Sequence, residues 1–510
     1  MSEIPTSTWH EDVSSNKVDK KSLRLLNALE REQKALALSQ FSTSEIERIK
    51  GLCHELWPSR WTATVRPPIQ RLQRRLTNAF RVQKSTRHET KPQQDSFVIE
   101  NMRGGSFNKV AGITAFGPSG RIQRRMVIRA PQAEGSDTEI ESRKNVTILR
   151  FVQRYTQIPI PNVIMSSPTS ENALGRPYII QHRIPGYDLE SEVQPYPSLT
   201  HKQKLSFVEQ YCSILLQMQQ IRHPWVGDII STDEDETFSV APFEIHSEPK
   251  ELMTDRSNVI PFFKVKAYGV SETVASEVDE DIESQDIMYF FKVQFARWRI
   301  HDIGLDPSVL WLDNIFHRLY IAASQMNSIG CLECESYCLA HYDLDPRNIM
   351  VEIVSGIPKV TGIVDWDLAM FAPNWVSCKP PMWIWNWIDG SNEDESRAGE
   401  EPPTTEQREL KRLFDDLVGE DFTYHAYQPH ARLARQLFRY ARWGLGSCDM
   451  WRDEAEKMLE EWGVLFADLS RRIAEKAEKE AADNGGAKSG ETDIGRKGEV
   501  EEDGDSDGQD

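Results

Sequence analysis

The sequence predicts an α+β fold with two lobes, a small antiparallel sheet followed by a larger, mainly helical region. Short runs rich in β-branched and aromatic residues, punctuated by glycine, fill residues 96–184. From residue 185 to about 475, apolar residues recur mostly at helical spacing. A chain of 510 residues is too long for one ordinary core, and 39% apolar residues are enough to build two. We therefore expect two packed lobes with an extension at each end.

The two extensions differ in charge. Residues 1–95 predict a helical N-terminal extension, in which "KKSLRLLNALEREQKALALSQF" has helical spacing and Ser44 is a plausible cap of the next helix. Within it, residues 56–91 carry nine Lys or Arg against one acid, a segment expected to dock on an acidic partner or on this protein's own acidic surface. Residues 476–510 are acidic and glycine-rich, and we expect them to be disordered.

The small lobe is expected to hold five strands and one helix. Three strand-like runs lie in "SFVIENMRGGSFNKVAGITAF" and "RIQRRMVIRAP", and two more in "IPIPNVIM" and "GRPYIIQHRI". A helical pattern at about residues 139–155 separates the third run from the fourth. The expected small lobe is therefore a sheet with one helix inserted between its third and fourth strands.

The large lobe is expected to be helical around one hairpin. Helical patterns cover about residues 200–222, 286–300, 308–328 and 405–475. Between the last two, the strand-like runs "NIMVEIV" and "KVTGIV" are joined by the turn-like "SGIP". This arrangement predicts a hairpin that returns the chain close to the residues that precede it.

Composition excludes several classes of protein. A net charge of −19 argues against non-specific binding to nucleic acid or to an anionic membrane surface. The N-terminus lacks the apolar core of a signal peptide, and no run approaches the roughly 18 apolar residues of a membrane span. Seven cysteines are too few for a disulfide scaffold. We expect a soluble, cytoplasmic protein with reduced thiols.

The chemistry is concentrated in two stretches, "HYDLDPRN" and "VTGIVDWD". The first supplies His341, Asp343 and Asn348, and the predicted hairpin folds Asp365 back beside Asn348. Phosphoryl transfer needs a base for the attacking hydroxyl, oxygen ligands for Mg²⁺ and donors for the phosphates. An Asp base and the paired oxygens of Asn348 and Asp365 meet the first two needs.

The two stretches resemble the aminoglycoside phosphotransferase and choline kinase-like family, and particularly its large fungal group, where a DW dipeptide replaces the DFG of protein kinases. The resemblance spans about residues 97–390. It implies a protein-kinase-like fold that binds ATP and Mg²⁺ and phosphorylates a hydroxyl of a small molecule. It also implies that Asp343 is the catalytic base, that His341 supports its loop, and that Asn348 and Asp365 bind the metal.

Upstream residues extend the resemblance to the phosphates. In "RGGSFNKV", Gly104 and Gly105 would let the backbone N–H groups of Ser106 and Phe107 approach a phosphate, although a glycine pair in a hairpin is more often a simple turn. In "RMVIRAP", Arg129 occupies the place of the phosphate-pairing lysine, with an exposed strand arginine as the alternative. Backbone groups at residues 181–183, between the lobes, would hold adenine.

One position departs from the family. The helix that follows Arg129 carries Asn145 where a glutamate normally orients the cation, and Glu141, four residues earlier on the same face, is the expected substitute. Without a helix carboxylate the cation is less well oriented. The alternative function is therefore a catalytically inactive pseudokinase that acts as a binding module.

Two further patterns have alternative interpretations. Cys331, Cys334, Cys338 and His341 suggest zinc, but their spacing is not a standard zinc pattern, and packed thiols are favoured. The alternating tryptophans of "PPMWIWNW" form either core or a substrate wall, because Trp faces attract cations. The expected partners are ATP and a small-molecule hydroxyl acceptor, and the sequence identifies neither the acceptor nor a protein partner.

Overall fold

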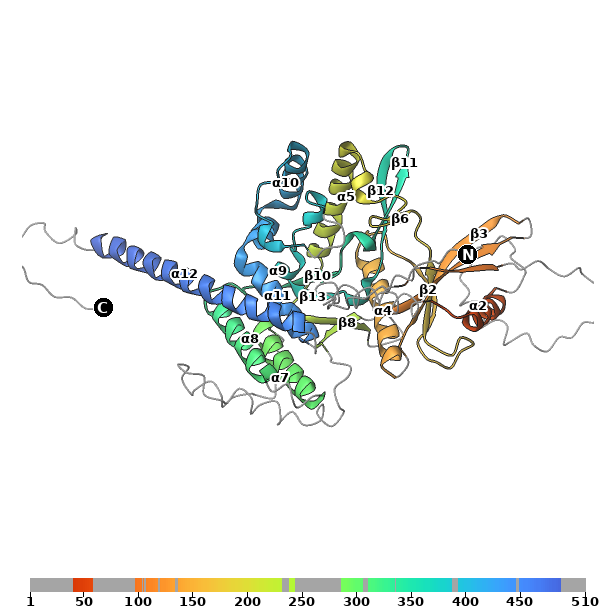
Figure 1. Cartoon of the computed structure of the whole chain (residues 1–510), viewed down its shortest axis with the longest axis horizontal. Coiled ribbons are helices and arrows are strands. Elements are labelled where there is room, and N and C mark those ends of the chain that lie inside the picture. The colour runs from red at the N-terminus through yellow and green to blue at the C-terminus, as the bar shows by residue number, and fades with distance from the viewer. Residues whose placement is uncertain are drawn as a thin grey trace, which may run out of the picture.

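The computed structural model has two lobes, so the predicted α+β fold class is confirmed (Figure 1). None of the helices in the described segments has both the length and the apolar character that a membrane crossing requires. The structure describes residues 40–57, 97–102, 104, 107–117, 120–133, 136–231, 238–243, 286–305, 311–334, 336–387, 393–445 and 449–487.

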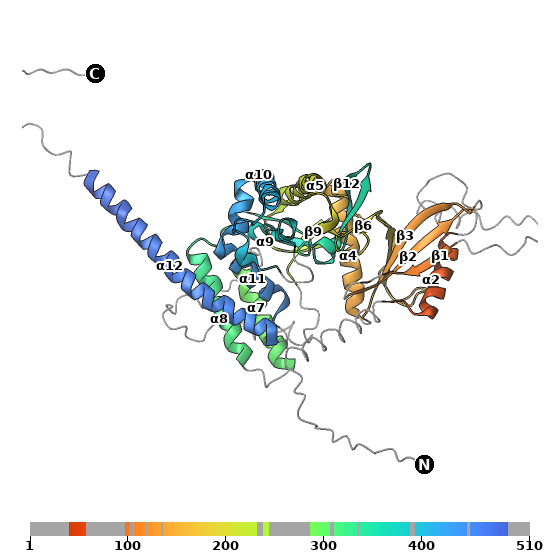
Figure 2. The same cartoon turned by 45° about the horizontal axis from the view of Figure 1, so that its top comes forward.

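The small lobe is a five-stranded antiparallel sheet with the predicted inserted helix. Its strands, in sheet order, are β1 (Phe97–Asn101), β2 (Asn108–Phe116), β3 (Ile122–Pro131), β5 (Tyr178–His182) and β4 (Val163–Ser167). Helix α4 (Ser136–Tyr155) follows β3 and lies between the sheet and the large lobe in both views (Figures 1 and 2). The third strand therefore runs directly into the helix that faces the second lobe.

Helix α2 (Thr43–Leu56) packs on the outer side of this sheet, away from the large lobe (Figure 2). Its N-cap is Ser42 rather than the expected Ser44, because Ser42 and Glu45 form a complete capping box. Glu45 also binds Lys109 of β2 at 3.0 Å. Part of the N-terminal extension is thus packed onto the small lobe. The helix contributes Ile49, Leu52 and Cys53 to the buried cluster of the sheet.

The large lobe is built from two sheets and seven α-helices in the described segments. One sheet has the order β7 (Arg222–His223), β10 (Tyr337–Ala340), β13 (Met370–Pro373), β8 (Gly227–Ser231) and β9 (Phe238–Ala241), and the other has the order β12 (Ile357–Ile363), β11 (Ile349–Val354) and β6 (Tyr187–Asp188). The helices are α5 (His201–Gln220), α7 (Ile287–Leu305), α8 (Trp311–Ser328), α9 (Asn374–Ser377), α10 (Thr405–Tyr427), α11 (Pro429–Trp443) and α12 (Asp449–Ala487). The helices predicted near residues 200, 286 and 308 are α5, α7 and α8.

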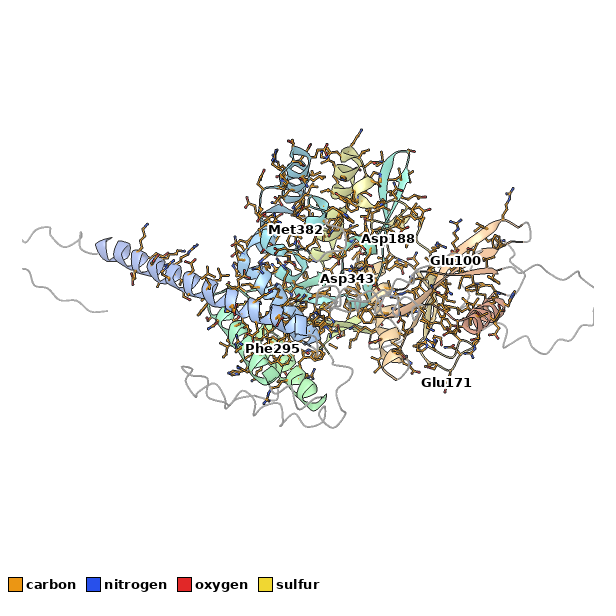
Figure 3. The ribbon with its side chains drawn as sticks, in the orientation of Figure 1. Glu100, Glu171, Asp188, Phe295, Asp343 and Met382 are labelled. Atoms are coloured by element: carbon orange, nitrogen blue, oxygen red, sulfur yellow. The ribbon has the colours of Figure 1, made fainter. Side chains whose placement is uncertain are left out.

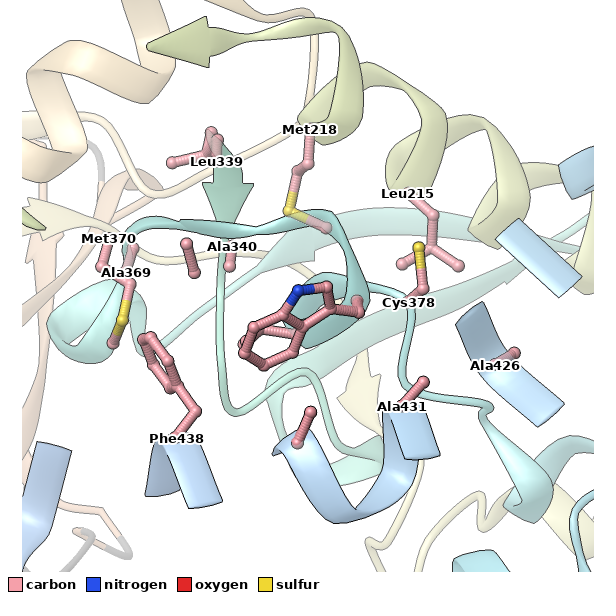
Figure 4. Close-up of a cluster of buried hydrophobic side chains, with 14 of the residues drawn as sticks. Leu215, Met218, Leu339, Ala340, Ala369, Met370, Cys378, Ala426, Ala431 and Phe438 are labelled. Atoms are coloured by element: carbon pink, nitrogen blue, oxygen red, sulfur yellow. The ribbon is translucent and has the colours of Figure 1, made fainter. Parts of the chain in front are cut away.

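The strand that leads into the HYD motif is embedded in this core. Leu339 and Ala340 of β10 are buried, and Ala340 lies between Met218 of α5 and Phe438 of α11 (Figure 4). Close-packed side chains of this kind resist displacement. The loop after β10 therefore starts from a rigid base.

The predicted hairpin is present as β11 and β12. Its turn residues Ser355 and Gly356 have φ of 53° and 81°, the positive values that a type I′ turn requires at both central positions. The register pairs Ile349 with Ile363, so the residues just outside the hairpin, 348 and 364, lie side by side.

The ends of the chain differ in part from expectation. Helix α12 continues to Ala487, beyond residue 476 where the sequence predicts a disordered tail, because "EKAEKEAAD" consists mainly of strong helix formers. Residues 488–510 lie outside the described residues. The same holds for residues 1–39 and for most of the basic segment at 56–91.

Candidate active site

His341 ties the loop after β10 to the segment after β12. Its side chain is 2% exposed, and its Nε2 lies 3.0 Å from the carbonyl oxygen of Val364. Burial lowers the pKa of His341 to about 4, so the ring is neutral near pH 7 and Nε2–H donates to that carbonyl. The ring also meets Trp366 edge-on at 4.6 Å between centroids. His341 therefore holds together the two stretches on which the site is built.

The backbone is strained at two positions of the site. Among the described residues, the non-glycine residues with positive φ are Tyr342 (65°), Ser355 (53°) and Asp365 (63°). Such conformations are uncommon for a bulky residue and concentrate at functional sites. Tyr342 packs against Trp443 with ring centroids 4.3 Å apart, a contact that helps to fix the turn before Asp343.

Asp343 is held by two donors at the lobe junction (Figure 3). Its Oδ1 accepts a hydrogen bond from Arg347 at 2.6 Å, and its Oδ2 accepts one from Asn348 at 3.0 Å. Burial raises the pKa of Asp343 to about 6; Arg347 opposes that rise, and the carboxylates of Asp345 and Asp365 add to it. Asp343 is thus a carboxylate of unusually high basicity whose orientation is fixed.

Asn348 and Asp365 fit a Mg²⁺ site. The backbone N–H of Val364 donates to the Asn348 carbonyl at 2.9 Å, which sets Asp365 next to Asn348. The Nδ2 of Asn348 donates to the Asp343 carbonyl at 2.7 Å as well as to its carboxylate, so the amide is oriented with Oδ1 remaining as an acceptor. One amide oxygen and one carboxylate are hard donors, and Mg²⁺ in kinase sites uses only one or two protein carboxylates plus phosphate oxygens. No group of three or more His, Cys, Asp or Glu side chains suited to a metal occurs in the described part of the chain.

Arg129 of β3 reaches across from the small lobe to two carboxylates. Its Nη2 lies 2.6 Å from Oδ2 of Asp367 and 3.1 Å from Oδ1 of Asp365. Burial lowers the pKa of Arg129, but Asp367 and Asp365 together raise it above its ordinary value. Burial also raises the pKa of Asp367, against the opposing effect of Arg129 and of Asn108, which donates to its Oδ2 at 3.0 Å. Arg129 is therefore a largely buried cation, 11% exposed and paired with two carboxylates through Nη2, rather than an exposed strand arginine.

The expected pairing of Glu141 with Arg129 is not found. Glu141 is exposed on α4, and among the described residues Arg129 forms its ion pairs with Asp367 and Asp365, both from the large lobe. The neighbouring Lys144 explains the placement of α4, because it forms a buried pair with Asp228 at 2.7 Å and so fixes the helix against the large lobe. Glu141 is therefore corrected from a candidate cofactor residue to a surface residue.

The predicted phosphate loop between β1 and β2 is described only at its ends. Gly104 is partly buried, and Phe107 is 69% exposed, with its carbonyl accepting from the N–H of Gln132 at 2.8 Å. Gly105 and Ser106 lie outside the described residues. Their proposed contact with phosphate stays a prediction.

A cavity of about 870 Å³ lies in the large lobe beside the loop that carries Asp343. Asp345 and Arg347 of the loop line it together with Lys379, whose Nζ lies 3.7 Å from Asp345. Glu393 also faces it, and burial raises the pKa of Glu393 to about 7 despite the opposing effect of Lys379. The cavity is therefore lined by ionisable groups of both signs beside this loop.

The tryptophans of "PPMWIWNW" belong largely to the core. Trp385 is buried against Phe414, with ring centroids 5.5 Å apart, and Trp383 is 5% exposed and packs against Tyr196 at 5.2 Å between centroids, so the core interpretation is confirmed for both. Trp383 and Trp387 also line the cavity, and their role as a substrate wall stays a prediction.

The cysteines next to the motif are ordinary thiols. The Sγ of Cys338 lies 3.0 Å from the Ser377 hydroxyl, and the Sγ of Cys334 donates to the Ser336 carbonyl at 2.8 Å. Burial raises the pKa of both Cys331 and Cys338 to about 11, so these thiols are protonated near pH 7. Zinc binds thiolate, so these observations agree with the packed-thiol interpretation.

Sequence reasoning missed three residues of the site. Asp367 is the second aspartate of "VDWD". Its position two residues after Asp365 was the only feature of the sequence that pointed to a role in the site. Arg347 lies within the HYD motif, but its contact with Asp343 depends on the loop conformation. Asn108 reaches Asp367 over 259 positions of sequence, a distance for which a single sequence carries no signal.

Comparison with known proteins gives distant relatives only. No family model matches the chain. Subtelomeric hrmA-associated cluster proteins from two strains of Aspergillus fumigatus are each 26% identical over 352 residues, which cover 62% of this chain and 67% of the relative.

Three solved structures illustrate the likeness in three dimensions. The GDP complex of wild-type aminoglycoside 2'-phosphotransferase-IIIa has a TM-score of 0.34 and 14% identity, and covers 78% of this chain and 98% of its own. The ternary complex of an aminoglycoside phosphotransferase APH(4)-Ia mutant with AMP-PNP and hygromycin B has a TM-score of 0.36 and 13% identity, with 72% and 93% covered. The macrolide 2'-phosphotransferase of Brachybacterium faecium has a TM-score of 0.34 and 14% identity, with 71% and 91% covered.

Proposed function

We propose that this protein transfers the γ-phosphoryl group of ATP to a hydroxyl of a small molecule. The observation that carries the proposal is the convergence of Asp343, Asn348 and Asp365 beside Arg129, where the two lobes meet. Two oxygen donors, one basic carboxylate and one guanidinium meet the requirements of phosphoryl transfer, which depends mainly on positioning and electrostatics.

Each side chain has a role that its contacts support. Asp343 accepts the proton of the attacking hydroxyl, and its bonds to Arg347 and Asn348 fix the direction in which it does so. Mg²⁺, held by Asn348 and Asp365, would supply positive charge to the phosphate oxygens. Arg129 donates to the same phosphates from the small lobe.

The acceptor is proposed to bind in the cavity that Tyr342 and Leu344, the neighbours of Asp343 in the sequence, help to line. Its volume of about 870 Å³ falls within the range of roughly 300–1,000 Å³ typical of small-molecule sites. Trp383 and Trp387 offer flat apolar walls, and Asp345 and Lys379 offer polar contacts close to the loop. An acceptor with one ring-sized apolar face and several hydrogen-bonding groups suits such a lining.

A catalytically inactive binding module is the second candidate. It is favoured by the contact of Arg129 with Asp365, which sets a cation on one oxygen of a proposed metal ligand. The two functions differ in whether ATP is consumed.

The test is ADP formation from Mg-ATP by the full chain, with pools of small hydroxyl compounds as acceptors. We expect acceptor-dependent ADP release, lowered by roughly 10²- to 10⁴-fold in Asp343→Asn, because that is the usual contribution of a positioned base. The exposed Asp416→Asn is the matched control and should retain the rate. An Asp343→Asn variant as active as wild type would remove Asp343 from the mechanism.

A further inference from the structure

We infer that Asp367 is the positioning residue for Arg129, the role that the sequence predicts for a carboxylate of helix α4. The inference rests on the proposed function, because positioning matters for a cation that contacts ATP. It assigns a role to the second aspartate of "VDWD", which the mechanism above does not use.

The contacts single out Asp367 over the alternatives. It makes the shortest ion pair of Arg129, 2.6 Å against 3.1 Å for Asp365. Its side chain is 15% exposed and that of Arg129 is 11% exposed, whereas Asp365 is 40% exposed. A charge pair shielded from water holds its geometry better than an exposed one. Asn108 fixes the same Oδ2 atom from β2.

Helix α4 forms its buried ion pair with β8 rather than with Arg129. Lys144, the residue before Asn145, pairs with Asp228 of β8 at 2.7 Å, and Arg442 of α11 lies 3.6 Å from the same Asp228 oxygen. All three side chains are largely buried, so this cluster fixes α4 to the large lobe. A helix held there by a lysine leaves the orientation of Arg129 to another element. The short helix η7 (Trp366–Leu368), which packs against α4, supplies the carboxylate.

The ion pair between Asp367 and Arg129 joins the two lobes. Arg129 belongs to β3 of the small lobe, and Asp367 belongs to the large lobe, two residues after the proposed metal ligand Asp365. The position of Arg129 therefore depends on how the lobes meet rather than on the small lobe alone. In this arrangement the phosphate-binding cation and the metal ligand are set by one segment.

The test compares binding of Mg-ATP and of adenosine to the full chain by calorimetry. We expect Asp367→Asn to weaken Mg-ATP binding by about tenfold or more, because it removes a charged hydrogen-bond partner of the phosphate-binding cation. Adenosine, which has no phosphate, should bind with unchanged affinity. Weakened binding of both Mg-ATP and adenosine would indicate a general structural defect and would overturn the inference.

A double variant separates positioning from direct metal binding. Once Arg129→Met has been made, adding Asp367→Asn should cost no further affinity for Mg-ATP, because Asp367 acts through Arg129. A full additional loss would show that Asp367 binds the metal itself and would overturn the inference. Equal losses in Glu141→Gln and Asp367→Asn would also overturn it, since the helix carboxylate would then share the role.

Two outcomes concern the variant and the parent protein. If Asp367→Asn does not fold, Asn108→Ala tests the same point more mildly and should weaken Mg-ATP binding without affecting adenosine; equal binding to wild type would count against the inference. Wild type that fails to bind Mg-ATP would overturn the proposed function, whereas wild-type binding with an unaffected Asp367→Asn would overturn only the role of Asp367.

Discussion

At the residue scale, the basicity of Asp343 results from neighbours that act in opposite directions. Burial and the carboxylates of Asp345 and Asp365 favour its protonated form, while Arg347 and Asn348 favour the ionised form. The balance leaves the pKa at about 6, close to the pH at which a general base works best. The charge of this residue is therefore easy to shift by substitution.

This balance predicts a pH dependence. Below pH 6 Asp343 is protonated and cannot accept a proton, so kcat/KM should fall as the pH drops through about 6 and level off above it. This acidic limb of the pH profile should be measured as kcat/KM, which reports the pKa values of groups in the free enzyme.

The variant Arg347→Gln tests whether the acidic limb of the pH profile is the titration of Asp343. Loss of the cation 2.6 Å from Asp343 should raise the pKa of Asp343 and move the acidic limb to higher pH. Glu352→Gln, at an exposed position on β11, is a matched surface control. An acidic limb that stays in place in Arg347→Gln would assign the titration to another group.

The sequence predicts the site residues that share a local motif and misses those joined by the fold. His341, Asp343 and Asn348 lie within one loop, and the hairpin that returns Asp365 has its own turn signal. The partner of Arg129 was misassigned to Glu141 because helical spacing says which residues share a face but not what that face meets. That requires the packing of α4 against the large lobe.

At the scale of elements, α4 is the link between the lobes. Its Lys144 and the Asp228 of β8 are 14% and 9% exposed, and Arg442 is a second cation 3.6 Å from Asp228. Burial is the main reason that the pKa of Lys144 is lowered, with Arg442 adding to it and Asp228 opposing it. The pair is thus a costly arrangement that persists only while its partners are complete.

Removing one partner should therefore destabilise the protein. Lys144→Met is expected to lower the free energy of unfolding by about 3 kcal/mol, near the lower end of the range for breaking a buried pair, because Arg442 still compensates Asp228 in part. The measurement is urea unfolding, with the exposed Arg143→Met as control. A Lys144→Met variant as stable as the control would contradict the anchoring role of this cluster.

The sequence predicts helices correctly where apolar residues recur at helical spacing over several turns. It fails where the outcome depends on packing against other parts of the fold or on a composition that suits two states. Helices α5, α7 and α8 lie close to their predicted ranges because their apolar spacing extends over several turns. Helix α12 continues past residue 476, where the sequence predicts the start of a disordered tail. The charged and alanine-rich composition there is compatible both with a solvated tail and with a helix. The position of α2 on the small lobe has no local signal, since it depends on burial against β1.

At the scale of the whole molecule, the site joins parts that are far apart in the sequence. The small lobe contributes Arg129 and Asn108, and the large lobe contributes the catalytic loop, the hairpin and the cavity beside it. Residues 485–510 carry nine of the 79 acids against three bases and lie largely outside the described residues.

The most direct test of the central claim is calorimetric titration of ATP into the full chain, with and without Mg²⁺, for wild type and Asp365→Ala. We expect metal-dependent binding to wild type and a loss of at least about tenfold in affinity in Asp365→Ala, because a charged ligand of the metal is removed. Binding that ignores both Mg²⁺ and Asp365, or no binding to the folded wild type, would contradict the assignment of this site to phosphoryl transfer.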